Sequence, residues 1–137
     1  MRIPTILTAA DGSSYLSSTD INMWTDTQAD TQDKATSNNR FPYGDPLHPI
    51  PFSEPWPVTR MDFWQFPANL SHTWRNPPQD VILVILKGQV LVEVSTGDTL
   101  VLLAGELALF KDTQGQGHKI GPRGKEDVTG LVLSLDT

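Results

Sequence analysis

The sequence predicts an all-β domain, built as an antiparallel barrel or sandwich, on three observations. From Val58 onward, apolar runs of four to eight residues recur at a spacing of roughly ten residues. Turn sequences that contain glycine separate these runs, and the 11 prolines and 10 glycines of the chain favour many short strands over long helices. No segment shows the apolar stripe of an amphipathic helix.

The expected strands follow one another along most of the chain. Residues 2–8 form the first, which ends before the turn sequence Asp11-Gly12-Ser13. Lys87-Gly88 is typical of a tight hairpin turn, and Ser95-Thr96-Gly97-Asp98 is typical of another reversal. In chain order we expect strands over Arg2–Thr8, Val58–Phe66, Leu70–Arg75, Val81–Leu86, Gln89–Ser95, Thr99–Leu103, Leu107–Lys111, Gly117–Ile120 and Val128–Ser134.

Side chains alternate between two faces of the strand expected over residues 58–66. The two faces are made of Arg60, Asp62, Trp64 and Phe66, and of Met61, Phe63 and Gln65. The sequence leaves open which of them faces the interior. We expect Trp64 in the core or in the wall of a pocket.

Residues 22–57 differ in composition from the rest of the chain. Residues 22–40 are mostly small and polar and show no apolar period, and residues 41–57 contain six prolines. We therefore expect one domain over residues 1–137, in which a long loop packs on a barrel formed mainly by residues 58–137. The loop aromatics Trp24, Tyr43 and Trp56 suit either a lid or a dimer interface.

Composition and charge exclude several classes of function. The net charge is −6, from 10 Lys and Arg against 16 Asp and Glu, and no basic cluster is present, which argues against a nucleic-acid partner. The chain has no cysteine, so a metal would need its three histidines and its carboxylates. The longest apolar run, Val81–Leu86, is too short to span a membrane, and residues 1–5 lack the apolar core of a secretory signal. We expect a cytoplasmic protein without a membrane partner.

One segment has a specific likeness to a known family. After a reversal at Gly88, the chain runs from Gly105-Glu106 to Asp112-Thr113-Gln114-Gly115-Gln116-Gly117-His118. This segment resembles the second motif of the cupin superfamily, and the resemblance extends to Asp11-Gly12-Ser13-Ser14 and to most of the chain outside residues 22–57. It implies a small antiparallel jelly-roll barrel, in which three histidines and a glutamate of the relatives hold a divalent metal.

The chain departs from that family pattern at the metal ligands. Counted back from Gly88, the acidic ligand falls on Val81, and the two histidines of the first motif fall on Trp74-Arg75 and Asn76-Pro77. His118 alone remains of the usual set. A lone imidazole does not hold a divalent ion tightly, and an arginine in the same cavity would repel it. We therefore expect a pocket without metal or other cofactor.

His118 and Arg75 are the two candidate catalytic residues. Imidazole titrates near neutral pH, so His118 suits a general acid or base, although a structural histidine bonded to the neighbouring turn is the alternative. If Arg75 points inward, as the replaced histidine does in the relatives, its guanidinium can hold an enolate, phenolate or carboxylate. The alternative for Arg75 is a rim position paired with Asp80 or Asp112.

The expected substrate-binding residues are mostly apolar or aromatic. Asp112 is also a typical turn-forming residue in the sequence Asp-Thr-x-Gly, and His72 is expected on the outward face as a structural residue. The expected set is Trp64, Asp62, Val81, Leu83, Phe110, Asp112 and Trp24.

These residues favour a metal-independent, redox-neutral enzyme. Cyclisation, isomerisation, dehydration or decarboxylation of a small apolar, aromatic or polyketide-like molecule fits, and small cupins of this kind resemble accessory enzymes of microbial and fungal secondary metabolism. A non-catalytic small-molecule binding cupin is the main alternative, and a metal-dependent oxygenase the third. We also expect a homodimer, because Arg2–Thr8 is an apolar terminal strand whose edge a partner would cover.

Overall fold

The all-β fold class predicted from the sequence is confirmed. The structure, a computed structural model, describes residues 1–24 and 50–136, in which every regular element is a strand. The strands are β1 (Arg2–Thr8), β2 (Ser14–Asp20), β3 (Val58–Phe66), β4 (Trp74–Arg75), β5 (Val81–Lys87), β6 (Gln89–Val94), β7 (Thr99–Leu103), β8 (Leu107–Phe110), β9 (His118–Pro122) and β10 (Val128–Leu135). This described part of the chain holds no helix with the length and apolar character needed to cross a bilayer.

The chain divides into two compact units, one made of Met1 with Asp20–Pro55 and the other of Arg2–Thr19 with Trp56–Thr137. In the first unit, the backbone amides of Trp24 and Phe52 donate to each other's carbonyl groups at 2.9 and 2.8 Å. The long loop expected over residues 22–57 falls largely on residues 25–49, which lie outside the described residues.

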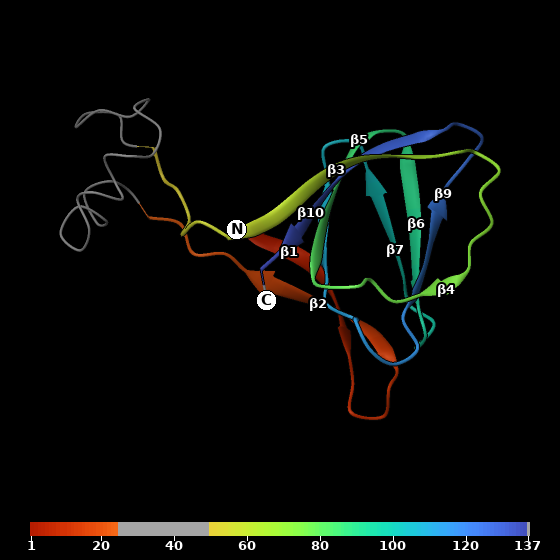
Figure 1. The fold of residues 1–137 in the computed structure, drawn as a ribbon, viewed down its shortest axis with the longest axis horizontal. Helices are drawn as coiled ribbons and strands as arrows, with labels where there is room; N and C mark the ends of the chain where they lie inside the picture. The colour runs from red at the N-terminus through yellow and green to blue at the C-terminus, as the bar shows by residue number, and fades with distance from the viewer. Residues whose placement is uncertain (25–49, 137) are drawn as a thin grey trace. The chain divides into compact units, whose positions relative to one another are not determined.

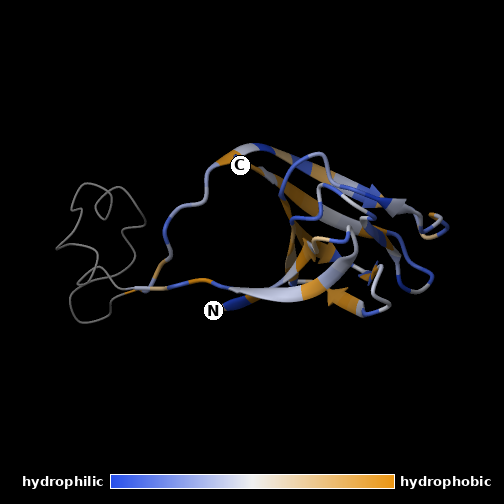
Figure 2. Cartoon of the chain, turned by 90° about the horizontal axis from the view of Figure 1, so that it is seen from below, coloured by the Kyte–Doolittle hydropathy of each residue, from blue (hydrophilic) through white to orange (hydrophobic). Residues whose placement is uncertain are grey.

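The strands of the second unit form two sheets (Figure 1). The six-stranded sheet has the order β2-β1-β8-β5-β10-β3, and the four-stranded sheet has the order β4-β9-β6-β7. Most neighbours are antiparallel, as expected, but β1 runs parallel to β8, with Thr5 opposite Leu109. Figure 2 shows hydrophobic segments along the strands. Along β6 and β10 buried residues alternate with more exposed ones, so one face of each strand points to the interior, whereas β8 is apolar throughout.

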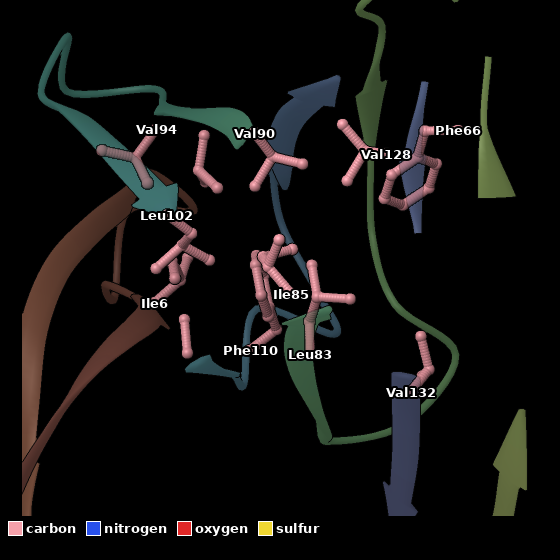
Figure 3. Close-up of a cluster of buried hydrophobic side chains, with 12 residues drawn as sticks. Ile6, Phe66, Leu83, Ile85, Val90, Val94, Leu102, Phe110, Val128 and Val132 are labelled. Atoms are coloured by element: carbon pink, nitrogen blue, oxygen red, sulfur yellow. The ribbon is translucent and has the colours of Figure 1, made fainter. Parts of the chain in front are cut away.

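The core lies between the two sheets. Val90, Val92 and Val94 of β6 are fully buried, and they meet Ile85 and Phe110 from the opposite sheet in one cluster (Figure 3). Such runs of β-branched residues suit a strand, because their stiff side chains pack well on a pleated surface. The remaining members are Ile6, Phe66, Leu83, Leu102, Ala108, Val128 and Val132.

Strand β2 was not expected from the sequence, and it changes the argument for a dimer. The segment Ser14–Asp20 is mostly polar, so no apolar period marks it, yet it pairs with β1 at the edge of the six-stranded sheet. Strand β1 therefore lies between β2 and β8, with both of its edges paired within the chain. The homodimer stays a prediction, but the unpaired edge on which it rested is absent.

The structure also settles which face of β3 is interior. Met61 and Phe63 are 54% and 69% exposed, whereas Phe66 is buried in the core. The face with Arg60, Asp62 and Trp64 therefore points inward with Phe66.

Gly117 allows the close approach of β4 to the start of β9. Its φ of 72° lies in the left-handed region, and a Cβ at this position would collide with the backbone carbonyl of Arg75. Gly97 has a similar φ of 98°, but a Cβ there would meet no atom within 4 Å. A comparison of alanine substitutions at Gly117 and Gly97 therefore separates the cost of backbone strain from the cost of steric collision.

We expect Gly117→Ala to lower the free energy of unfolding by about 3 kcal/mol or more, because strain and overpacking add there. Gly97→Ala, which adds only the strain, should cost about 1 kcal/mol. Urea denaturation of both variants measures the difference. Equal losses would show that Gly117 is required for its dihedral angle alone.

Candidate functional site

A cavity of about 330 Å³ is lined by residues from strands of both sheets of the second unit. This volume is at the small end of the range for small-molecule pockets. Seven of the nine residues expected at the site line it: His118, Arg75, Trp64, Asp62, Val81, Leu83 and Phe110. Their roles stay predictions, but the fold brings them together. The other lining residues are Arg60, Phe66, Asn76, Pro77, Pro78, Gln79, Ile120, Val132 and Ser134.

Strand registers arrange part of this lining as a belt around the cavity. Ser134 of β10 stands opposite Arg60 on one side and opposite Val81 on the other, and Val81 stands opposite Phe110. The Phe110 ring contacts the His118 ring at a centroid distance of 4.6 Å, and His118 stands opposite Arg75. The belt therefore consists, in order, of Arg60, Ser134, Val81, Phe110, His118 and Arg75.

Beyond the belt the cavity is lined mostly by apolar side chains. Two residues before Ser134 on β10, Val132 stands opposite both Asp62 and Leu83, and these three form the next row of side chains across the six-stranded sheet. Trp64 and Phe66 follow along β3, and their rings meet edge to face at a centroid distance of 5.9 Å. The cavity thus has a polar end at the belt and an apolar end near Trp64 and Phe66.

His118 is held by a short buried hydrogen bond. Its Nδ1 lies 2.6 Å from Oδ2 of Asp112, and the two side chains are 9% and 0% exposed. An ionised Asp112 accepts the Nδ1 proton, which leaves Nε2 as the ring nitrogen available to a ligand. The pair thus has the arrangement of a carboxylate that orients a catalytic imidazole.

The turn between β8 and β9 positions Asp112. Asn76 donates its side-chain amide to the carbonyl oxygens of Asp112 and Gly115, at 2.9 and 3.3 Å. Ser14 donates to the carbonyl of Gly117 at 2.6 Å. The carboxylate of Asp112 lies against His118 and is fully buried, and Asp112 is not among the residues that line the cavity, so its expected contact with a substrate stays a prediction. Its Oδ1 has no hydrogen-bond partner among the described residues.

Arg75 has neither of the carboxylate partners that the sequence allowed. Its Nε donates to Oγ1 of Thr73 at 3.0 Å. Asp80 instead lies 4.0 Å from the ammonium of Lys111, and Asp112 is committed to His118. Arg75 is exposed and lines the cavity next to His118 in register.

Two further expectations concern residues outside the cavity lining. Trp24 belongs to the first unit, where it pairs with Phe52, and its substrate contact stays a prediction. His72 has a structural contact, since its Nε2 lies 3.2 Å from the carbonyl oxygen of Pro122. The His72 ring also occupies the space beside Gly121 that a Cβ would fill.

Sequence reasoning did not select Arg60 or Ser134, although both lie on the belt. Arg60 was placed on one face of its strand, and that face could be assigned to the interior only once the register was known. Ser134 belongs to the alternation along β10, in which Val128, Gly130 and Val132 also face inward. Period-two alternation was the available signal for Ser134.

The donor set does not fit a divalent metal at the position that the family resemblance implies. Arg75 brings a positive charge, Val81 has no donor atom, and Nδ1 of His118 is already bonded to Asp112. Among residues 1–24 and 50–136, no three His, Cys, Asp or Glu side chains gather into a possible metal site. We therefore assign no chemical step to a metal.

Comparison with known proteins gives matches among solved structures. No protein-family profile and no curated protein matches the chain. A putative ethanolamine utilization protein Q from Salmonella typhimurium is 16% identical, with a TM-score of 0.46 and coverage of 98% of this chain and 95% of the other. The cupin domain of Cnp3 from Schizosaccharomyces pombe is 13% identical, with a TM-score of 0.46 and coverage of 98% and 84%.

A cupin domain from Bordetella pertussis is also similar, with 20% identity, a TM-score of 0.44, and coverage of 56% of this chain and 80% of the other. Neither substrate nor reaction follows from likenesses at this level. The arguments about chemistry rest on the residues of the cavity.

We expect elemental analysis of the purified protein to find only trace amounts of Fe, Mn, Ni and Zn, because the belt offers one imidazole beside a cation. About one ion per chain, lost in His118→Ala, would contradict this expectation and direct attention to metal-dependent chemistry.

Proposed function

We propose that this protein is a metal-independent, redox-neutral enzyme of isomerase or lyase type, in which His118 moves a proton of a small molecule bound in the cavity. The observation that supports this most is the buried bond between His118 and Asp112 beside Arg75 on the belt. A small apolar, aromatic or polyketide-like molecule suits the remaining lining. Cytoplasmic location and a place in secondary metabolism stay predictions.

His118 is suited to act as the base because its ring is fixed and its Nε2 has no hydrogen-bond partner in the part of the chain that the structure describes. Asp112 holds the tautomer with the proton on Nδ1 and stabilises the imidazolium that forms when Nε2 takes a proton. Phe110 packs on the ring at 4.6 Å and limits its movement. The enclosed surroundings strengthen both effects, since charges interact more strongly away from bulk water.

Arg75 is suited to stabilise the charge that proton removal creates. In the proposed step, a C–H bond next to a carbonyl breaks, the proton moves to Nε2 of His118, and the electron pair forms an enolate. The guanidinium of Arg75, on the neighbouring strand, offsets the negative charge on the enolate oxygen. Return of the proton to a different atom isomerises the substrate, and departure of a leaving group from the carbon next to the enolate, with its bonding electron pair, gives a lyase.

A binding protein without catalysis is the second candidate. The aromatic pair Trp64 and Phe66 would retain a flat apolar ligand by contact alone, without any proton transfer. The two candidates differ in the effect of changing His118, because a binder needs the ring as a contact and an enzyme needs it as a base.

We expect His118→Ala to lower the rate of proton exchange by about 10²–10⁴-fold while changing ligand affinity by only a small factor. The measurement is incorporation of deuterium from D₂O into a panel of phenolic and polyketide-like ketones, followed by proton NMR, with affinity determined separately by calorimetry. If the parent protein exchanges none of the panel and His118→Ala loses ligand affinity, the binding protein is the correct assignment.

Asp112→Asn tests the orienting contact. The amide is nearly the same size as the carboxylate, but it can present a donor to Nδ1 and so favour the wrong tautomer, so we expect exchange to fall by about 10²-fold or more. Urea denaturation must accompany the assay, since a change at a buried charged pair can itself destabilise the fold. Full activity in a folded Asp112→Asn variant would remove the orienting role.

A further inference from the structure

We propose that the substrate is a monoanionic amphiphile, namely a small oxo acid whose carboxylate binds Arg75 and whose compact apolar body extends toward Trp64 and Phe66. This inference rests on the proposed function and narrows it to a substrate class. It follows from the charges on the belt, from the free atoms of Arg75 and from the register of the strands.

The charges that line the cavity leave one cation unmatched. Nε of Arg60 lies 2.9 Å from Oδ2 of Asp62, its neighbour but one on the same strand, so those two charges offset each other. Arg75 has no carboxylate partner among the described residues, because its described contact is to the neutral hydroxyl of Thr73. The side chains that line the cavity therefore carry one net positive charge, at Arg75, and the carboxylate of Asp112 lies outside the lining, bonded to His118. One negative charge on a ligand would match the guanidinium.

The hydrogen bonds of Arg75 indicate what kind of anion fits. Nε donates to Thr73, which leaves the two terminal NH₂ groups of the guanidinium for a ligand. Two parallel N–H donors match the two oxygens of a carboxylate. A phosphate monoester carries up to two negative charges, and the second would find no free cation and would lie toward Asp62 or the apolar side chains.

The strand registers give the orientation of the bound molecule. Arg75 and His118 stand directly opposite each other on β4 and β9, so their side chains share a face and are neighbours. The apolar side chains Leu83 and Val132 lie one level further along the six-stranded sheet, and Trp64 and Phe66 lie beyond them. A carboxylate on Arg75 thus places the adjacent carbons beside His118 and the hydrocarbon part at the apolar end.

This orientation explains why an oxo acid is the favoured class. A carbon between a ketone and the rest of the body carries a proton acidic enough for an imidazole base, whereas a simple carboxylate lacks such a proton. The carboxylate accepts one N–H from each terminal NH₂ group of Arg75, and the ketone oxygen lies within reach of a remaining N–H, so the same guanidinium also offsets the enolate that forms beside His118. The substrate must therefore carry its carboxylate and its ketone within a few bonds of each other.

Binding of inert probes tests the anion site separately from catalysis. The probes are 3-phenylpropanoate, its neutral amide 3-phenylpropanamide, and phenethyl phosphate, with affinity measured by calorimetry on the full chain. We expect the wild-type protein to bind the acid at least about tenfold more tightly than the amide, and more tightly than the phosphate. Equal binding of acid and amide, absence of binding, or a preference for the phosphate would each overturn the proposal.

Two variants assign the preference to Arg75. Arg75→Gln should reduce the acid-to-amide ratio to within about threefold, because the amide side chain retains polarity without charge. Lys119→Gln is the matched control, since Lys119 occupies the next register pair of the same two strands, opposite Trp74, and its ammonium lies over the Trp74 ring. Lys119→Gln also removes one positive charge, but outside the cavity lining, so the ratio of acid to amide affinity should stay about tenfold or more.

A ratio that persists in Arg75→Gln, or that falls equally in Lys119→Gln, would show that Arg75 is not the anion site. Circular dichroism establishes whether each variant folds. If a variant does not fold, the comparison of acid and amide binding by the wild-type protein still decides the substrate class. Because the probes do not react, this result is independent of proton transfer. If the wild-type protein exchanges no substrate proton but still binds the acid more tightly than the amide, the proposed reaction is wrong and the anion site at Arg75 stands.

Discussion

The pairing of β10 with both β3 and β5 determines how the interior of the barrel is arranged. Because one strand sets the register of its two neighbours, Ser134 aligns Arg60 with Val81, and Val132 aligns Asp62 with Leu83. A slip of one residue would turn every side chain of β3 to the opposite face and place Met61 and Phe63 inside. The separation of a polar belt from an apolar end is thus a property of backbone hydrogen bonding as much as of side-chain choice.

The buried pair of His118 and Asp112 is costly to form and is retained beside a cavity. Burial of the carboxylate removes its hydration, and Oδ1 gains no hydrogen bond among the described residues in return. A hydrophobic pair of similar size would satisfy packing without that cost. The contacts that hold the turn, from Asn76 to Asp112 and Gly115 and from Ser14 to Gly117, support the pair from elements far away in the sequence.

The sequence was most informative where alternation and turns agree, and least informative where a long-range contact decides. Strands β1, β3 and β7 have the expected bounds, since apolar runs between turn residues mark them. Strand β2 was missed because its side chains are mostly polar, so no apolar alternation marks it, and its pairing with β1 is a contact that the local pattern does not show. Seven of the sixteen residues that line the cavity were predicted, from the family resemblance and from strand alternation. The contact of Asp112 with His118 depends on how the intervening turn folds, and no local sequence pattern indicates that contact.

The two-residue strand β4 forms one part of the cavity wall and has far fewer backbone pairings than the strands on the other side. It lies at the edge of its sheet and pairs with β9 at two positions, whereas β10 pairs with β3 at eight. Opening of such a short edge segment breaks few backbone bonds, so it requires much less free energy than global unfolding. Movement at β4 would separate Arg75 from His118 and would also strain the contacts of the adjacent Asn76 with Asp112 and Gly115, so the geometry of the cavity depends on a strand of two residues.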